Sequence, residues 1–414
     1  MIECKMEADL FPEDSRISKQ LRRLSREDNA ERFLEMIQQL EDTVVMSENI
    51  KYVRRNADHI LDGLFDHLQD LVNGRLRGCI GQVGHIMDND SERFVNTCFS
   101  KIEHWRHTEL KVLALRGLYH FLELDITGHH LSMVGDSLVE RLHSLLEATE
   151  TVEVMVATVD IFRKIHAVSP SIISSFFEDI VDILVGWHID YSQPADVTSY
   201  VSLSLQSFTE LWLRNLTFAN TLLSQFIEDM EDYMEESANE ESDPSEDDYG
   251  FDSSCNIKKV AAFIGVYTTT LRCIGNQADP SLNPSLPASF HISSLRKMIG
   301  GAEKLLKNQH EDSILNALNQ LSIVLLPFNL KGLLEQILIL INMHQNCVKQ
   351  MNFSAQLSFL YLLKQTIQQL GSTIPMHLVQ HLFSVNSPLK ELRMSPQQEV
   401  WKQALSVYHS FLRR

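Results

Sequence analysis

The sequence predicts an all-α protein, an α-solenoid of HEAT/armadillo-like helical hairpins, and two observations on residue pattern support this fold class. Apolar residues recur at three- and four-residue steps through nearly the whole chain of 414 residues, which is the period of an amphipathic helix. The alternating apolar and polar runs that are typical of strands are essentially absent. Only 16 Gly and 11 Pro interrupt the helical pattern.

A third observation is that the predicted helices repeat. Several of them begin with a polar stretch that leads into an apolar one, and one anchor position can be marked in each. The anchors are Leu76, Leu113, Met155, Ser202, Ala261, Leu315, Leu357 and Trp401. Most intervals between anchors are roughly 40 residues, as in two-helix HEAT and armadillo repeats. Two intervals are longer, and each contains an insertion. This spacing favours a solenoid over a globular bundle.

Changes in composition along the chain predict the boundaries between its parts. The expected parts are an N-terminal tail and basic helix over 1–28, a first helical-repeat arm over 29–236, an acidic disordered loop over 237–256, a helix over 257–276, a Pro-rich linker over 277–288 and a second, truncated arm over 289–414. The prolines of the linker cannot continue a helix. The loop is predicted to be disordered because it has almost no aliphatic residues.

The first predicted helix has a basic side and an apolar side. Its basic residues are Arg16, Lys19, Arg22, Arg23 and Arg26. The opposite side carries Ile17, Leu21 and Leu24. Three interpretations stay open: a solvated face above a docked apolar one, contact with an acidic partner or the acidic loop, and RNA binding. No aromatic residues are interleaved with the charges, which disfavours RNA. The five basic residues are candidate partner-docking residues.

Three glycines, Gly78, Gly81 and Gly84, follow one another at three-residue steps. A dinucleotide-binding loop has the pattern GxGxxG after a strand, and neither condition holds here. We therefore expect these glycines to permit close packing between helices. Farther along, the pattern of Leu113, Leu118, Phe121 and Leu122 predicts a helix with a buried face, as does that of residues 33–44.

Histidine pairs could indicate a metal site, but the ligands are too few. His104 and His107 are three residues apart, and His377 and His381 are four apart. A zinc site needs three or four protein ligands, and no Cys or third carboxylate accompanies either pair. We expect no metal and no cofactor. His129 and the histidine after it are predicted to lie in a loop between helices.

The segment 176–191, FFEDIVDILVGWHIDY, has a broad apolar helical face. Phe177, Ile180, Leu184 and Trp187 are predicted to lie in the core between helices. Gly186 is expected to interrupt the helix near its end, and the helix should stop before Pro194.

The formal net charge of −19 is unevenly spread. Residues 228–252 hold thirteen acids and no Lys or Arg, so the rest of the chain is only mildly acidic. This balance disfavours nonspecific binding to nucleic acid or to an acidic membrane. Ser245 is followed by three acids, the pattern preferred by acid-directed kinases, and is a candidate phosphosite.

Cysteine usage and the N-terminus indicate the compartment. The six cysteines lie far apart without a CxxC pair, which suits a reducing compartment. The acidic N-terminus has no signal-peptide pattern, and no apolar run reaches the roughly 18 residues of a membrane span. We expect a cytoplasmic protein, with the nucleus as a second compartment and no membrane partner.

No catalytic motif is present. The sequence contains no P-loop, no GxSxG and no HRD or DFG element of a kinase. We therefore expect no enzyme activity for this chain. An active site assembled from scattered residues stays open as an alternative.

Three segments resemble one known family. They are FPEDSRIS (11–18) continuing through LRRLSRED (21–28), VDILVGWHID (181–190), and TLLSQF (221–226) with EDME (228–231). In this order they resemble the N-terminal HEAT-like region of the phosphatidylinositol-3-kinase-related serine/threonine-protein kinase of nonsense-mediated mRNA decay, the Smg-1 family. The chain ends at Arg414 within a predicted helical unit, so we expect a fragment truncated before the kinase domain.

The resemblance implies a function that residue pattern alone does not give. It implies a non-catalytic scaffold arm that docks accessory subunits of the kinase complex and contacts the rest of the kinase chain. In the family, the intact kinase phosphorylates Ser-Gln and Thr-Gln sites on the Upf-type RNA helicase. Kinase cofactors would belong to the missing lobes. The alternative is an unrelated helical-repeat adaptor or transport receptor.

Overall fold

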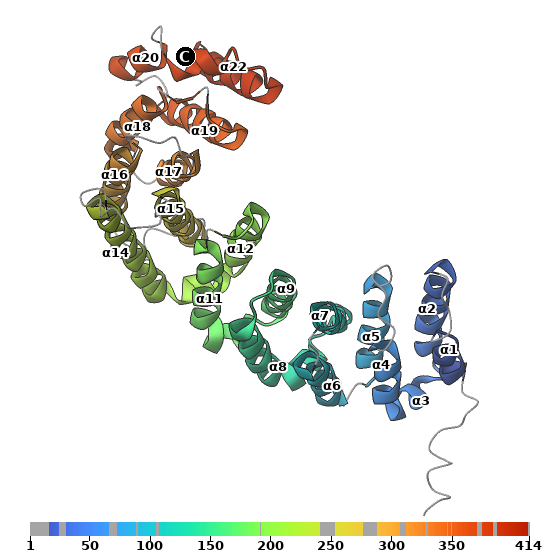
Figure 1. The fold of residues 1–414 in the computed structure, drawn as a ribbon. Coiled ribbons are helices and arrows are strands. Elements are labelled where there is room, and N and C mark those ends of the chain that lie inside the picture. The colour runs from blue at the N-terminus through green and yellow to red at the C-terminus, as the bar shows by residue number, and fades with distance from the viewer. Residues whose placement is uncertain are drawn as a thin grey trace, which may run out of the picture. The chain divides into compact units, whose positions relative to one another are not determined.

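The computed structural model describes residues 16–24, 30–65, 73–87, 90–104, 107–190, 192–240, 253–275, 288–306, 312–327, 330–345, 347–348, 350–370, 375–383 and 387–412. The regular secondary structure of these residues is helical, and no strand occurs among them (Figure 1). The chain divides into two compact units, Met1–Ile183 and Leu184–Arg414. The division falls inside α11 (Phe177–Ile189).

The first unit consists of helical hairpins in two rows. Its helices are α1 (Arg16–Leu24), α2 (Ala30–Val44), α3 (Ile50–Arg55), α4 (Ala57–Phe65), α5 (Asn73–Met87), α6 (Ser91–His104), α7 (Thr108–Leu124), α8 (His129–Ala148), α9 (Val152–Val168), α10 (Pro170–Ile173) and the 3-10 helix η3 (Ser174–Phe176). One row is formed by α2, α5, α7 and α9, and the other by α4, α6 and α8. Helices from the two rows pair, for example α6 with α7 and α8 with α9.

The second unit repeats this arrangement. Its helices are α12 (Ala195–Ser207), α13 (Thr209–Arg214), α14 (Leu216–Glu240), α15 (Ser253–Gly275), α16 (Ala288–Leu305), α17 (Asp312–Leu325), α18 (Leu330–Gln345), α19 (Phe353–Leu370), α20 (Met376–Phe383), α21 (Pro388–Leu392) and α22 (Gln398–Leu412). One row is formed by α12, α15, α17, α19 and α22, and the other by α14, α16, α18 and α20. Pairs such as α16 with α17 join the two rows.

The predicted repeat matches these rows. The eight anchors fall one each in α5, α7, α9, α12, α15, α17, α19 and α22. Within each unit, successive members of this series pack against one another. The prediction of an all-α solenoid of helical hairpins is confirmed, because each helix buries its apolar face against the next repeat.

The predicted apolar faces form the core. Ile37, Leu40 and Val44 of α2 are fully buried, as are Leu118 and Phe121 of α7.

Several glycines of the first unit allow neighbouring helices to approach closely, as expected. A Cβ atom added to Gly81 would lie 2.6 Å from the His120 side chain, and one added to Gly84 would lie 2.6 Å from Phe94.

Helix boundaries differ from the prediction near the acidic loop. α14 extends to Glu240 and α15 begins at Ser253, so both enter the range 237–256 assigned to the loop. α14 and α15 pack against each other within the second unit. The boundary between the two compact units therefore does not lie at the acidic segment, although the composition changes there. The helices before and after this segment, α14 and α15, belong to the same unit.

Two local predictions are wrong. α11 continues through Gly186 to Ile189, because a single glycine costs a helix only about 1 kcal/mol. His129 and His130 are not in a loop but begin α8. The turn before them contains Gly128, whose φ of 70° gives the chain the left-handed conformation that starts the next helix.

Candidate protein-interaction surfaces

The predicted basic helix α1 is amphipathic in the way the sequence indicated. Ile17, Leu21 and Leu24 are buried, and α1 packs against α2 and α4. Gln20 Nε2 of α1 donates to Thr43 Oγ1 of α2 at 3.1 Å. Because this side of α1 is buried against α2 and α4, the opposite side of the helix faces solvent.

The structure describes three of the five candidate docking residues. Arg16, Lys19 and Arg23 are exposed on α1. The side chain of Arg22 and the whole of Arg26 lie outside the described residues, as does the candidate phosphosite Ser245. The roles of these residues in docking and in phosphorylation stay predictions.

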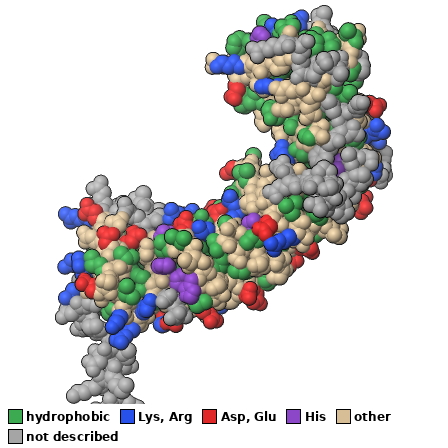
Figure 2. Space-filling model, turned by 180° about the vertical axis from the view of Figure 1, so that it is seen from behind, with side chains coloured by type: hydrophobic (Ala, Val, Ile, Leu, Met, Phe, Trp, Pro, Cys, Tyr) green, Lys and Arg blue, Asp and Glu red, His purple; other side chains and the backbone are tan. Residues whose placement is uncertain are grey.

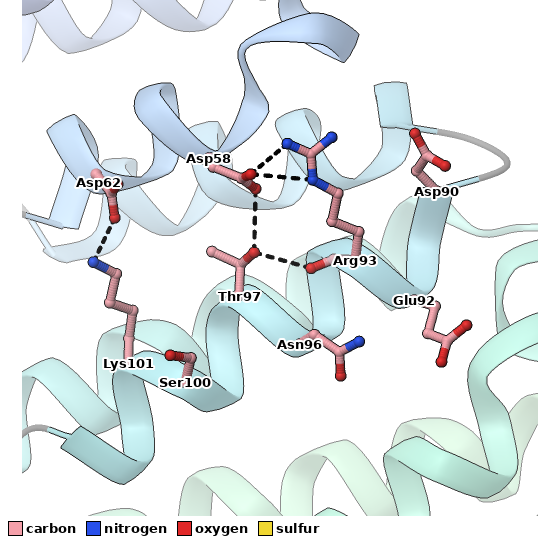
Figure 3. A pocket seen from close by; sticks show the side chains of 9 residues that line it. All are labelled: Asp58, Asp62, Asp90, Glu92, Arg93, Asn96, Thr97, Ser100 and Lys101. Carbon is pink, nitrogen blue, oxygen red and sulfur yellow. Dashed lines mark hydrogen bonds and ion pairs between the residues drawn. The ribbon is translucent and has the colours of Figure 1, made fainter.

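A larger polar surface, which the sequence reading missed, lies between α4 and α6. It is a groove of about 740 Å³ lined by Asp58, Asp62, Asp90, Glu92, Arg93, Asn96, Thr97, Ser100 and Lys101 (Figure 3). We call it the α4–α6 groove. Two carboxylates come from successive turns of α4, whereas the two cations come from α6.

Ion pairs cross this groove. Arg93 binds Asp58 through two nitrogens, and Lys101 pairs with Asp62. Thr97 Oγ1 lies 3.3 Å from Asp58 Oδ1 and 2.9 Å from the Arg93 carbonyl oxygen. Figure 3 shows Arg93 and Lys101 reaching from α6 toward the α4 carboxylates. These partly exposed pairs connect the two helices and define the polar wall of the groove.

The charge of the α4–α6 groove is unbalanced. Both cations are paired with α4 carboxylates, and the lining adds Asp90 and Glu92, which are exposed at the start of α6. The groove therefore presents an excess of negative charge to a partner. In the space-filling view, acidic and basic side chains are otherwise scattered over the visible face of the first unit (Figure 2).

A sequence signal for the groove exists but is weak. Asp58 and Asp62 are four residues apart, as are Arg93 and Thr97, so each set lies on one face of its helix. Periodicity shows which side of a helix is exposed. It does not show which neighbouring helix faces that side, so the pairing could not be foreseen.

The segment 176–191 contributes mainly to the core between helices. Phe177, Ile180 and Leu184 are buried as predicted, but Trp187 is only half-buried. The adjacent His188 is the buried residue instead, and its Nε2 lies 3.0 Å from Ser202 Oγ. Burial lowers the pKa of His188 to about 4, so its imidazole is neutral near pH 7.

The described histidines form no recognisable metal site. His104 and His107 are both exposed, and His104 Nδ1 lies 2.6 Å from the Ser100 carbonyl oxygen. His130 is buried, with Nδ1 2.8 Å from Ser91 Oγ. The side chains of His377 and His381 lie outside the described residues. In the part of the chain that the structure describes, no three His, Cys, Asp or Glu residues gather as metal ligands.

The buried thiols are poor nucleophiles. Cys79 and Cys98 are fully buried, and burial raises the pKa of both thiols. Since the thiolate is the reactive form, these groups stay protonated at neutral pH. No helix in the described ranges is long and apolar enough to cross a membrane. We identify no catalytic group among the described residues.

Comparison with known proteins gives the family. No family model matches the chain. The chain is 31% identical to the serine/threonine-protein kinase SMG1 of Danio rerio over 408 residues, which are 97% of the chain and 11% of that kinase. It is 26% identical to the serine/threonine-protein kinase Smg1 of Drosophila melanogaster over 406 residues, which are 94% of the chain and 12% of that kinase.

Solved structures show a weaker similarity. The karyopherin Kap121p bound to the SUMO protease Ulp1p matches 95% of the chain and 45% of its own length, with a TM-score of 0.49 and 12% identity. Kap121p alone has a TM-score of 0.46 and 13% identity over the same shares. This similarity is too low to indicate a shared function.

The sequence match agrees with the structure. The chain spans only about a tenth of the length of the kinases that it matches. The described residues are helical and include no kinase lobe. The resemblance seen in the three short segments is thus confirmed along nearly the whole chain, which belongs by sequence to the Smg-1 family of serine/threonine-protein kinases.

Proposed function

We propose that this chain is a non-catalytic scaffold region of a kinase of nonsense-mediated mRNA decay and that it docks accessory subunits of the kinase complex. The observation that carries the proposal is the match to SMG1 kinases over 97% of a chain that consists of helical hairpins. Repeat proteins of this kind use extended surfaces to bind other proteins. The intact kinase would phosphorylate the Upf-type RNA helicase in the cytoplasm, and in the nucleus as a second compartment.

The α4–α6 groove is the first proposed docking surface. The ion pairs of Asp58 and Asp62 cross it, and its remaining acids, Asp90 and Glu92, favour a partner with a basic surface. Charges at the edge of an interface mainly speed association and set its salt dependence. The exposed residues Arg16 and Arg23 of α1 form a second surface, suited to an acidic partner.

The proposal is tested in the full-length kinase. Replacing Asp90→Lys and Glu92→Lys together should weaken the binding of one accessory subunit about tenfold at 0.1 M salt and less at higher salt. The double substitution Glu147→Lys and Glu150→Lys makes the same charge change on exposed residues outside the groove and serves as the control. Subunits are quantified by mass spectrometry of the purified kinase, and activity is measured on a short Ser-Gln peptide.

The outcomes separate the alternatives. The proposal predicts loss of a subunit with unchanged activity on the peptide, since no catalytic part is touched. Deleting the whole segment should remove the subunits that the groove and α1 bind. If a kinase that lacks the segment retains every subunit, or if the segment recovers transport cargo instead, the scaffold proposal is wrong.

A further inference from the structure

The sequence contains three Ser-Pro pairs, and the structure places them in different surroundings. They are Ser169-Pro170, Ser387-Pro388 and Ser395-Pro396. Kinases of the proline-directed class select a serine by the residue that follows it, since proline has no backbone N–H. All three pairs meet this requirement in sequence. The structure decides which serine hydroxyl a kinase can reach.

Ser387 is closed to a kinase. It is fully buried and is the N-cap residue of α21. Its Oγ donates to the Leu382 carbonyl oxygen and accepts the Lys390 amide at 3.2 Å. Because these bonds tie the serine to the start of α21, a kinase could bind its hydroxyl only if that helix unfolded.

Ser169 is held between two helices. It is half-buried, and α9 ends at the residue before it while α10 begins at the residue after it. Its amide donates to the Ile165 carbonyl at 2.8 Å, and its carbonyl accepts the Ile172 amide at 3.2 Å. The extended conformation that a kinase active site requires around a substrate serine would break both bonds.

Ser395 lies in an open turn. Residues 393–397 join α21 to α22 without helical structure. Ser395 is half-buried, but its neighbours in the chain are exposed, Met394 to 81%. Its Oγ accepts the Gln397 amide at 3.3 Å, a long hydrogen bond, and its own amide donates to the Leu392 carbonyl at 3.2 Å. Opening this turn frays only the end of α21, which costs little free energy.

There is room for a phosphate group beside Ser395. A cavity of about 460 Å³ borders the turn, and its lining includes Ser395, Pro396 and Gln397. The turn leads directly into α22, and the backbone N–H groups in the first turn of a helix favour negative charge nearby. Glu399 in that turn and Glu391 on α21 reduce this gain. A phosphate on Ser395 is therefore compatible with the fold.

We propose that Ser395 is a phosphorylation site for a proline-directed serine kinase, with ATP as the phosphoryl donor. Ser395 Oγ attacks the γ-phosphorus of ATP, the bond from that phosphorus to the β–γ bridging oxygen breaks, and ADP and the hydroxyl proton are released. The product adds a charge of about −1.5 to −2 to the turn, with oxygens that accept from Arg or Lys side chains of a partner. This site is in the second unit and does not depend on the docking proposed for the α4–α6 groove.

The test uses the whole chain, a purified proline-directed kinase of the mitogen-activated class and MgATP. Mass spectrometry measures the rate of phosphate incorporation at each serine. A synthetic peptide of residues 380–402 presents Ser387 and Ser395 without the fold and is the reference. Ser395 of the folded chain should react within about tenfold of its rate in the peptide, whereas Ser387 should react at least about 100-fold more slowly than in the peptide.

Two substitutions separate the motif from the fold. Pro396→Ala keeps Ser395 but removes the residue that the kinase selects, so phosphorylation of Ser395 should be lost. Pro194→Ala changes an exposed proline before α12, outside the site, and should leave the rate at Ser395 unchanged. Both prolines are exposed and precede a helix, so neither substitution should prevent folding.

The proposal fails if Ser387 and Ser395 react at equal rates in the folded chain, because the kinase would then act on unfolded molecules. It also fails if Ser395 takes up no phosphate, either in the folded chain, where the turn would be closed, or in the peptide, where the sequence would not be a substrate. An unchanged rate in Pro396→Ala would contradict the proposed class of kinase.

Discussion

The two units share one architecture but differ in how tightly glycines bring their helices together and in how far buried polar contacts extend between helices. In the first unit, glycines bring backbones together, and a Cβ atom on Gly117 would lie 2.4 Å from Ile80. In the second unit, a Cβ atom added to Gly265 would lie 3.1 Å from the His188 ring, and one added to Gly186 or Gly300 would meet no atom within 4 Å. Buried polar side chains lie between helices in both units, and those of the second unit include a network that joins three helices.

A chain of hydrogen bonds illustrates the second kind of packing. Asn319 of α17 is fully buried, and its Nδ2 lies 3.1 Å from His344 Nε2 of α18 and 3.2 Å from Ser358 Oγ of α19. His344 also stacks on Phe359, with 4.0 Å between ring centroids. We call Asn319, His344 and Ser358 the polar seam. Close packing and directional bonds thus both hold this repeat, and the two should fail under different perturbations.

The substitution with the largest expected effect on stability tests close packing in the first unit. Gly117→Ala should lower the local stability of α5 and α7 by about 3 kcal/mol, because overpacking a close contact costs roughly 1–3 kcal/mol and Ile80 is fully buried. Hydrogen exchange of peptides from α5 and α7, followed by mass spectrometry, measures the change.

The matched control lies in the second unit. Gly300→Ala should stabilise α16 by about 0.5–1 kcal/mol, since alanine favours a helix and the added methyl group meets no atom. If both substitutions have the same effect on exchange, close packing does not distinguish the units.

The substitution with the next largest expected effect on stability tests the polar seam. Asn319→Leu keeps a similar volume but removes the donor to His344 and Ser358, and it should cost about 2 kcal/mol because buried polar groups lose their partner. Faster exchange is expected in α17, α18 and α19. Leu318→Met, a conservative change at the fully buried neighbouring position, is the control and should cost under about 1.5 kcal/mol. Equal exchange in the two variants would show that the seam contributes no specific stability.

These contrasts also show how far the sequence could predict the structure. The anchors located one helix row in each unit, because burial of one face imposes a period that a single sequence displays. The close approach at Gly81 and Gly84 followed from the absence of a side chain. In contrast, the polar seam joins three helices whose register depends on packing, and no local pattern links Asn319 to His344.

The interaction surfaces were less predictable for the same reason. The exposed side of α1 was read from its sequence, since Ile17, Leu21 and Leu24 define the buried side. The α4–α6 groove needs two segments that are distant in sequence. Trp187 shows a related limit, because periodicity gives the face of a helix but not how far along that face a neighbouring helix covers it.

The smallest effect concerns pH and the neutral histidine of the polar seam. Burial lowers the pKa of His344 to about 4, from an ordinary value of 6.5. Between these values the unfolded state binds a proton that the folded state excludes, so stability is complete above pH 6.5 and falls as pH decreases toward 4. From pH 7.5 to 5.5, His344 should account for a loss of about 1.4 kcal/mol.

The variant His344→Gln isolates this contribution. It cannot be protonated, so it should be less stable than the parent at pH 7.5 yet lose about 1.4 kcal/mol less on acidification to pH 5.5. Exchange of α17–α19 peptides at the two pH values, corrected for the intrinsic rate, provides the measurement. His104→Gln changes an exposed histidine of the first unit and should leave the pH dependence of these peptides as it is. An unchanged pH dependence in His344→Gln would mean that the histidine is protonated within the folded seam, and directional bonding would then not explain the packing of the second unit.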